Sequence, residues 1–146
     1  HFTGPVVSYD SVGKVTSYKE VDFDDNTFYH IIYNENEGIS EVHGKALSKS
    51  VLLDNDSDTI SMNHSTGISF VYAEPPGYIA KIESTLNDKK CEYPVRQDFL
   101  KHHIVLITIP YVDSAQSMTI NVKNTLYNKL GTPVLQDSIS YTIYRK

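Results

Sequence analysis

The sequence predicts an all-β protein, an antiparallel β-sandwich in preference to a small barrel, and three observations support this prediction. Short runs rich in Val, Ile, Tyr and Phe recur along the chain, and these residues pack well on a pleated sheet. Clusters of Gly, Pro, Asn and Asp separate the runs, as expected of turns. No segment has the clear apolar period of an amphipathic helix.

The first half of the chain contains both alternating and dense apolar runs. Val15–Phe23 alternates as a strand does, although neither of its sides is uniformly apolar, and Thr27–Tyr33 is dense enough to indicate burial on both faces. Polar turn formers at Asn34–Gly38 and Asp54–Asp58 suit hairpin connections. The strands expected here are Pro5–Tyr9, Val15–Phe23, Thr27–Tyr33, Ile39–His43, Lys45–Leu53, Thr59–Asn63 and Gly67–Ala73.

The second half contains the strongest strand pattern, Leu100–Ile109, which Pro110 closes because proline lacks a backbone donor. Residues 84–98 carry two lysines, Asn, Asp and Pro, and they predict a loop with a helical turn. Residues 123–133 predict a turn-rich connection. The strands expected here are Tyr78–Glu83, Leu100–Ile109, Ser117–Val122 and Asp137–Tyr144.

Length and composition indicate one domain, residues 1–146, and exclude several classes of protein. A chain of 146 residues can bury a sizeable core without disulfides, and its single cysteine, Cys91, cannot form an intramolecular one. The net charge of −5 and the sparse basic residues argue against a nucleic-acid partner. The longest apolar run, His103–Ile109, is too short to span a membrane.

Four segments near the C-terminus resemble the closing strands of bacterial immunoglobulin-like surface modules. They are Leu106–Pro110, Met118–Asn124, Asn128–Gly131 and Ser138–Ile143. They are similar in strand and turn chemistry: a strand ending in a turn, a tight connection and a Tyr-Thr-Ile final strand. The resemblance implies an antiparallel β-sandwich of the immunoglobulin or fibronectin type III kind. It also implies an extracellular or cell-surface protein used for adhesion, ligand binding or spacing, and it assigns no functional residue.

Two acidic clusters predict possible calcium sites, since carboxylates spaced two residues apart can converge on a hard cation. The clusters are Asp54, Asp56 and Asp58, and Glu20, Asp22, Asp24 and Asp25. The first lacks the Gly and Glu of an EF-hand loop, which Thr59 and Ser65 replace. The alternative is a hairpin tip in which each side chain bonds its own backbone.

His1 predicts a possible copper site, because an initial histidine can bind copper through its amino group and its imidazole. The alternative is that His1 remains from a tag or a chosen boundary. Partners for a histidine brace would come from His43, His64, His102 and His103. His102 and His103 are adjacent on an expected strand and should face opposite ways, one in the core and one on the surface.

The sequence contains no nucleophile elbow, phosphate loop or other catalytic motif. The leading hypothesis is therefore a non-catalytic module that binds a protein or a carbohydrate through loops 34–38, 54–58 or 84–98. A copper or redox protein built on His1 is the alternative, and an enzyme whose residues converge only in the fold is the third. Tyrosines in the expected strands could stack on sugars, or lie at the core rim with wet hydroxyls. These are Tyr29, Tyr33, Tyr72, Tyr78, Tyr141 and Tyr144.

Overall fold

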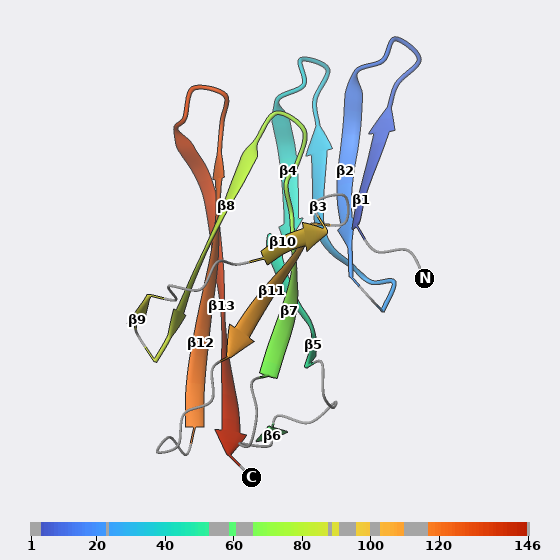
Figure 1. Ribbon diagram of the computed structural model, residues 1–146. Helices are drawn as coiled ribbons and strands as arrows, with labels where there is room; N and C mark the ends of the chain where they lie inside the picture. Colours follow the sequence, from blue (N-terminus) through green and yellow to red (C-terminus); the bar gives the residue numbers. More distant parts are fainter. Residues whose placement is uncertain are drawn as a thin grey trace.

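The all-β class predicted from the sequence is confirmed in the computed structural model. The structure describes residues 4–22, 24–52, 59–60, 66–87, 89–90, 96–99, 103–109 and 117–145. These residues form strands and connecting turns, and no helix occurs among them. The strands lie in three sheets, in which β6 pairs with β13 in parallel and the other recorded pairings are antiparallel (Figure 1).

The first sheet, which we call the meander, has the order β1-β2-β3-β4. Its strands are β1 (Gly4–Tyr9), β2 (Val15–Val21), β3 (Thr27–Tyr33) and β4 (Ile39–Gly44). The second, the short sheet, has the order β10 (Arg96–Phe99), β11 (Ile104–Ile109), β7 (Thr66–Tyr72) and β5 (Leu47–Leu52). The third, the long sheet, has the order β6 (Thr59–Ile60), β13 (Pro133–Arg145), β12 (Ser117–Tyr127), β8 (Ile79–Leu86) and β9 (Lys89–Lys90).

Four hairpins share one turn design. In each, an Asp or Asn side-chain Oδ1 accepts hydrogen bonds from the backbone N–H groups two and four residues later. The residue three positions later has a positive φ, as in a type I turn followed by a bulge. The turns begin at Asp10, Asp22, Asn34 and Asn128. The turn chemistry predicted for 34–38 is therefore confirmed, and it stiffens the hairpin tips.

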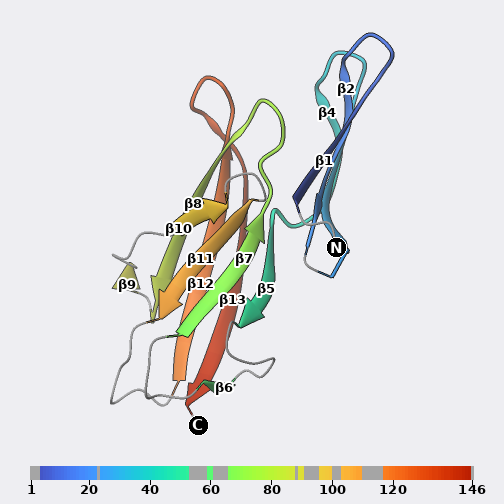
Figure 2. The ribbon, with the colours of Figure 1, turned by 45° about the vertical axis from the view of Figure 1, so that its right-hand side comes forward.

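Two apolar clusters hold the sheets together. The lower one lies between the short and long sheets and contains Phe70 and Tyr72 of β7 together with Ile120 and Val122 of β12. In the upper one, Tyr18, Tyr29 and Ile31 of the meander pack against residues from outside that sheet. Leu126 of β12 is one of them. The half-buried Ala80 of β8 contacts both clusters, so the two cores are continuous. Figure 2 shows the short sheet in front of the long sheet, with the meander beside them.

Two segments expected to be irregular are largely strand. Residues 84–98 contain the end of β8, β9 and β10 among their described positions, so the prediction of a loop with a helical turn is wrong there. Strand β12 continues to Tyr127, into the stretch expected to be turn-rich. The polar residues Asn124 and Thr125 misled the prediction, because both are buried in the strand.

The link between the meander and the short sheet is fixed at Ala46. Its N–H donates to Oδ2 of Asp137 at 3.0 Å, and its carbonyl accepts from the N–H of Ala73 at 3.0 Å. The fully buried Asn124 donates from Nδ2 to the carbonyls of both Ala46 and Ala73, at 3.0 Å each. These hydrogen bonds satisfy the backbone polar groups of the connection between β4 and β5, which lies outside the strand pairings of both sheets.

We expect Asn124→Ala to lower the free energy of unfolding by about 2–3 kcal/mol, because two hydrogen bonds to buried carbonyls are lost. Chemical denaturation measures the change. Asn121→Ala is the matched control: it lies on the same strand, its side chain bonds only the exposed Ser140, and a surface change of this kind usually costs under about 0.5 kcal/mol. Equal losses in the two variants would contradict the role assigned to Asn124.

Candidate functional site

The hairpin tips of the meander and of the long sheet converge on one hollow, which we call the interface cleft. Its volume is about 430 Å³, within the range of small-ligand and side-chain pockets. Three elements line it: the meander, the β7–β8 loop and the β12–β13 turn. The lining residues are Val15, Tyr33, Glu37, Pro76, Gly77, Tyr78, Asn128, Lys129 and Leu130.

The cleft combines aromatic, charged and apolar groups. Glu37 sits at the tip of the β3–β4 turn, where its Oε1 accepts from the N–H of Val15 at 3.2 Å. The side chain of Lys129 passes over Gly77, since its Cε lies 4.0 Å from where a Cβ on that glycine would be. Leu130, at the tip of its hairpin, is 90% exposed. An acid, a base and an exposed aliphatic side chain thus surround one opening.

Tyr33 brings an unused hydrogen-bonding group to the cleft. Its hydroxyl is buried and has no hydrogen-bond partner among the described residues. Burial, and to a smaller extent the neighbouring Tyr78, raises the pKa of Tyr33 to about 12. The hydroxyl therefore keeps its proton at neutral pH and is available as both donor and acceptor. An unpartnered buried polar group is costly, so the Tyr33 hydroxyl weakens the packing beneath the cleft.

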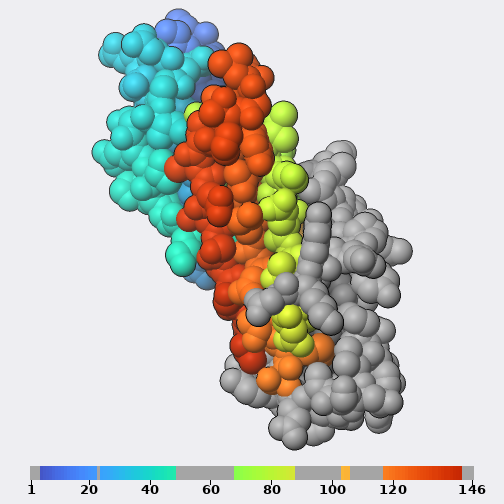
Figure 3. Space-filling view, turned by 90° about the vertical axis from the view of Figure 1, so that its left-hand side faces the viewer, coloured from blue at the N-terminus to red at the C-terminus, as the bar shows by residue number. Residues whose placement is uncertain are grey.

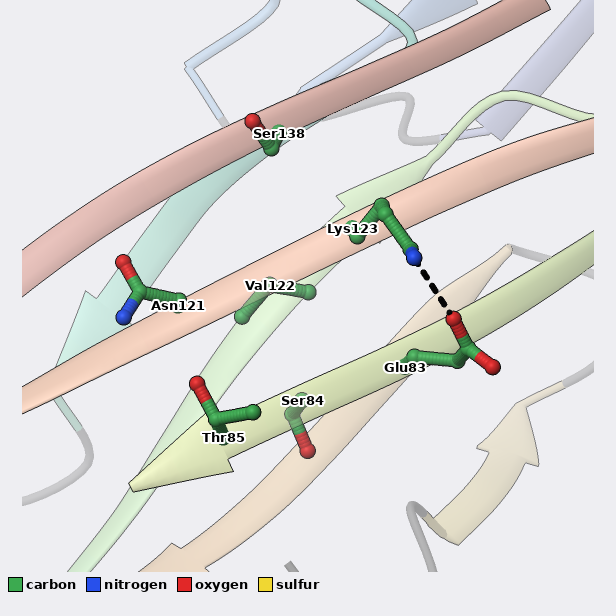
Figure 4. Close-up of a pocket in the computed structure, with 7 residues that line it drawn as sticks. All are labelled: Glu83, Ser84, Thr85, Asn121, Val122, Lys123 and Ser138. Carbon is green, nitrogen blue, oxygen red and sulfur yellow. Dashed lines mark ion pairs between the residues drawn. The ribbon is translucent and has the colours of Figure 1, made fainter. Parts of the chain in front are cut away.

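A second hollow of about 500 Å³ lies over the long sheet and is lined mainly by polar side chains (Figure 4). Figure 3 shows this face, with β13, β12 and β8 side by side. Its charges are already paired: Nζ of Lys123 lies 2.9 Å from Oε2 of Glu83, and Nζ of Lys81 lies 3.5 Å from Oε1. The Lys123 ammonium holds the pKa of Glu83 below its usual range. This is what the solvated face of an antiparallel sheet requires, and it calls for no ligand.

A buried polar cluster joins the meander to the turn before β11. The Glu20 carboxylate is fully buried, accepts a hydrogen bond from the Tyr18 hydroxyl, and has its Oε2 3.0 Å from Nδ1 of His103. The Tyr18 hydroxyl also accepts from the N–H of Glu74 at 2.9 Å. The His103 ring stacks on Tyr72, with centroids 5.2 Å apart. Because the His103 side chain is only 12% exposed, the cluster serves packing rather than access to a substrate.

Burial dominates the electrostatics of this cluster. Desolvation raises the pKa of Glu20, and the contact with His103 only partly opposes the rise. The same desolvation, together with the nearby Glu20 carboxylate, raises the pKa of Tyr18. Oε1 of Glu20 has no hydrogen-bond partner in the described part of the chain. The carboxyl is therefore a proton-binding group at the contact between the meander and the rest of the molecule.

Most of the metal ligands predicted from the sequence lie outside the described residues, and those within them do not converge on a metal site. His1, Asp54, Asp56 and Asp58 lie outside the described residues, as do His64, His102 and Cys91. In the second acidic cluster, Glu20 points inward while Asp22 caps the β2–β3 turn. Within the described ranges, no three His, Cys, Asp or Glu side chains are placed to hold a metal ion. Asp22 therefore follows the hairpin-tip interpretation, whereas Glu20 follows neither interpretation, because it is buried in strand β2.

The predicted roles of the histidines and tyrosines are partly corrected. His103 is a satisfied, largely buried histidine as expected, but it occupies a turn with φ +52° rather than a strand. Tyr29 and Tyr72 are 1% and 2% exposed, so they are core residues. The hydroxyls of Tyr29 and Tyr33 are sealed from solvent rather than wet. Sequence patterns missed this because the residues that pack over Tyr29 and Tyr33, such as Leu126, come from outside the meander.

The described residues contain no helix with the length and apolar character needed to cross a membrane. Searches against protein-family models, curated proteins and solved structures found no match to this chain.

Proposed function

We propose that residues 47–145 form an immunoglobulin-like sandwich and that the chain is a non-catalytic binding or adhesion module of a surface or secreted protein. Its ligand, a protein or a carbohydrate, would bind in the interface cleft. The observation that carries this proposal is the coincidence of two features: an immunoglobulin-type strand order and a cleft built from the loops at one end of those strands.

The strand order supports the immunoglobulin-like assignment. When the strands β5, β7, β8, β10, β11, β12 and β13 are lettered A to G in chain order, the short sheet has the order D-E-B-A. The same lettering gives G-F-C in the long sheet. Constant-type immunoglobulin domains have an ABED sheet and a CFG sheet. The strands β6 and β9 are two-residue additions at the edges of the long sheet.

The position of the cleft supports a binding role. With this lettering, the β7–β8 loop is the B–C loop and the β12–β13 turn is the F–G loop, and both line the cleft. In immunoglobulin variable domains, the loops at this end bind the ligand. The meander adds a third wall, including loop 34–38, which the sequence had indicated as a binding loop. Tyr33, Tyr78 and Lys129 supply the aromatic and polar contacts that binding sites use.

A screen with matched variants tests the proposal. The chain, tetramerised through a tag, is applied to a glycan array and to a panel of purified extracellular protein domains. For a ligand of the cleft, Leu130→Ala should weaken binding about tenfold, since an exposed apolar contact is lost, and Lys129→Glu should weaken it more. Leu130→Ala should leave the free energy of unfolding nearly unchanged, because the Leu130 side chain is 90% exposed.

The controls are Thr85→Ala and Asn121→Ala on the face of the long sheet, which should bind as the wild type does. A ligand whose affinity falls with the control variants and not with Leu130→Ala or Lys129→Glu would place the site on the sheet instead. The absence of any binder in both collections would count against the proposed function itself.

A further inference from the structure

The outer face of the meander brings two histidines together. His30 of β3 and His43 of β4 are direct partners in the antiparallel register, and their ring centroids are 6.1 Å apart with the planes tilted by 37°. Both lie on the face opposite the core, because the flanking residues Tyr29 and Ile31 are the buried ones on β3. The His43 side chain is 61% exposed, so solvent reaches the pair.

The surroundings of the two rings suit a metal ligand. The ring nitrogens of His30 make no hydrogen bond within the described part of the chain. Nε2 of His43 lies 2.9 Å from Oε2 of Glu41, on the same strand and the same face. Donation of a proton to a carboxylate is the arrangement that orients metal-binding histidines.

We propose that His30 and His43 form a binding site for a divalent transition-metal ion of the imidazole-binding class, such as Cu²⁺, Ni²⁺ or Zn²⁺, with Glu41 orienting His43. In this site Nε2–H of His43 donates to Glu41 and the other ring nitrogen binds the metal. Water completes the coordination shell, since the described residues provide no third ligand. The site shares no residue with the proposed ligand cleft.

The distance between the rings is compatible with a shared ion. Metal–nitrogen bonds of about 2.0–2.1 Å to both rings would bring the centroids to about 5 Å. Closing the present 6.1 Å requires the exposed side chains of His43 and Glu41 to shift together by about 1 Å. Lys19, the cross-strand partner of His30, opposes the binding of a cation through charge repulsion. The site is therefore expected to be of moderate strength and to respond to changes at Lys19.

Titration of the full chain with Cu²⁺ tests the proposal. Paramagnetic broadening in ¹H–¹⁵N NMR spectra should centre on residues 30, 41 and 43, and EPR should show nitrogen ligands. His30→Ala and His43→Ala should each weaken binding at this site by more than tenfold, and Glu41→Gln by about tenfold. Lys19→Gln should strengthen it severalfold, a result that a merely structural histidine pair would not produce.

His1→Ala is the matched control, because an N-terminal histidine is itself a copper ligand. The broadening at residues 30 and 43 should persist in this variant. His30→Gln keeps a polar side chain of similar size and serves as a second, milder variant at this position. Thermal unfolding without metal confirms that each variant is folded. The proposal is overturned if broadening is confined to other residues, or if the His30 and His43 variants bind copper at this site as the wild type does.

Discussion

Replacing Gly44 by alanine is expected to lower the free energy of unfolding by at least about 3 kcal/mol, because the added Cβ would be strained and would overlap the backbone of β3. Gly44 ends β4 with a φ of +83°, a conformation that costs an L-residue about 1–3 kcal/mol. A Cβ there would lie 2.0 Å from the carbonyl oxygen of Phe28 and 2.9 Å from its carbonyl carbon. Both atoms belong to the backbone of β3, so relief requires breaking the β3–β4 pairing.

Chemical denaturation of Gly44→Ala and Gly131→Ala separates strain from steric overlap. Gly131 has a similar φ of +78°, but an added Cβ would meet nothing within 4 Å. Gly131→Ala should therefore show only the conformational cost, about 1 kcal/mol. If the two variants lose the same free energy, the close approach between Gly44 and Phe28 does not contribute.

The all-β class could be predicted from the sequence because strand and turn signals are local. The turns at Asn34 and Asn128 depend on one side chain bonding its own backbone, and that chemistry can be recognised in a short segment. The extent of β12 could not be recognised in this way. Asn124 has the composition of a turn residue, and it is stable in a buried strand only because Ala46 and Ala73, far away in the chain, offer their carbonyls.

The candidate sites were harder to predict because each joins residues distant in the sequence. The cleft takes its walls from residues near positions 15, 35, 77 and 129, which only the sheet topology brings together. The histidine pair had a usable signal: the hairpin around the Asn34–Gly38 turn places His30 opposite His43. Of the two, only His43 was among the partners predicted for His1, because the register between residues 27–33 and 39–44 is not evident from the sequence alone.

Glu20 shows why an acidic cluster in a sequence is a weak indicator of a metal site. It was grouped with Asp22, Asp24 and Asp25, yet strand alternation places Glu20 on the same inner face as Tyr18. The difference between a solvated carboxylate and a buried one depends on what packs against the strand. Here His103 and Glu74 come from the other side of the interface.

Glu20→Gln is expected to change how stability depends on pH. The pKa of Glu20 is raised above its ordinary value of 4.5, mainly by burial, while Tyr18, His103 and Glu74 surround the carboxyl. The folded state therefore binds a proton that the unfolded state has released. The resulting stabilisation is fully present below pH 4.5 and is lost as pH rises through the folded-state value. Relative to Glu20→Gln, the wild type should gain stability on acidification from neutral pH, by at most about 1.4 kcal/mol per pH unit.

Denaturant unfolding of both proteins between about pH 7.5 and pH 5 measures this slope. Glu83→Gln is the control with the opposite sign: the Lys123 ion pair lowers the pKa of Glu83 below 4.5, so the wild type should keep its advantage over this variant between pH 7.5 and pH 5 and lose it only as pH falls below 4.5. A wild type that instead loses stability relative to Glu20→Gln on acidification would mean that the Glu20–His103 contact outweighs desolvation. The buried carboxyl would then act as an ion-pair partner in the interface, and acid would separate the meander from the sheets it covers.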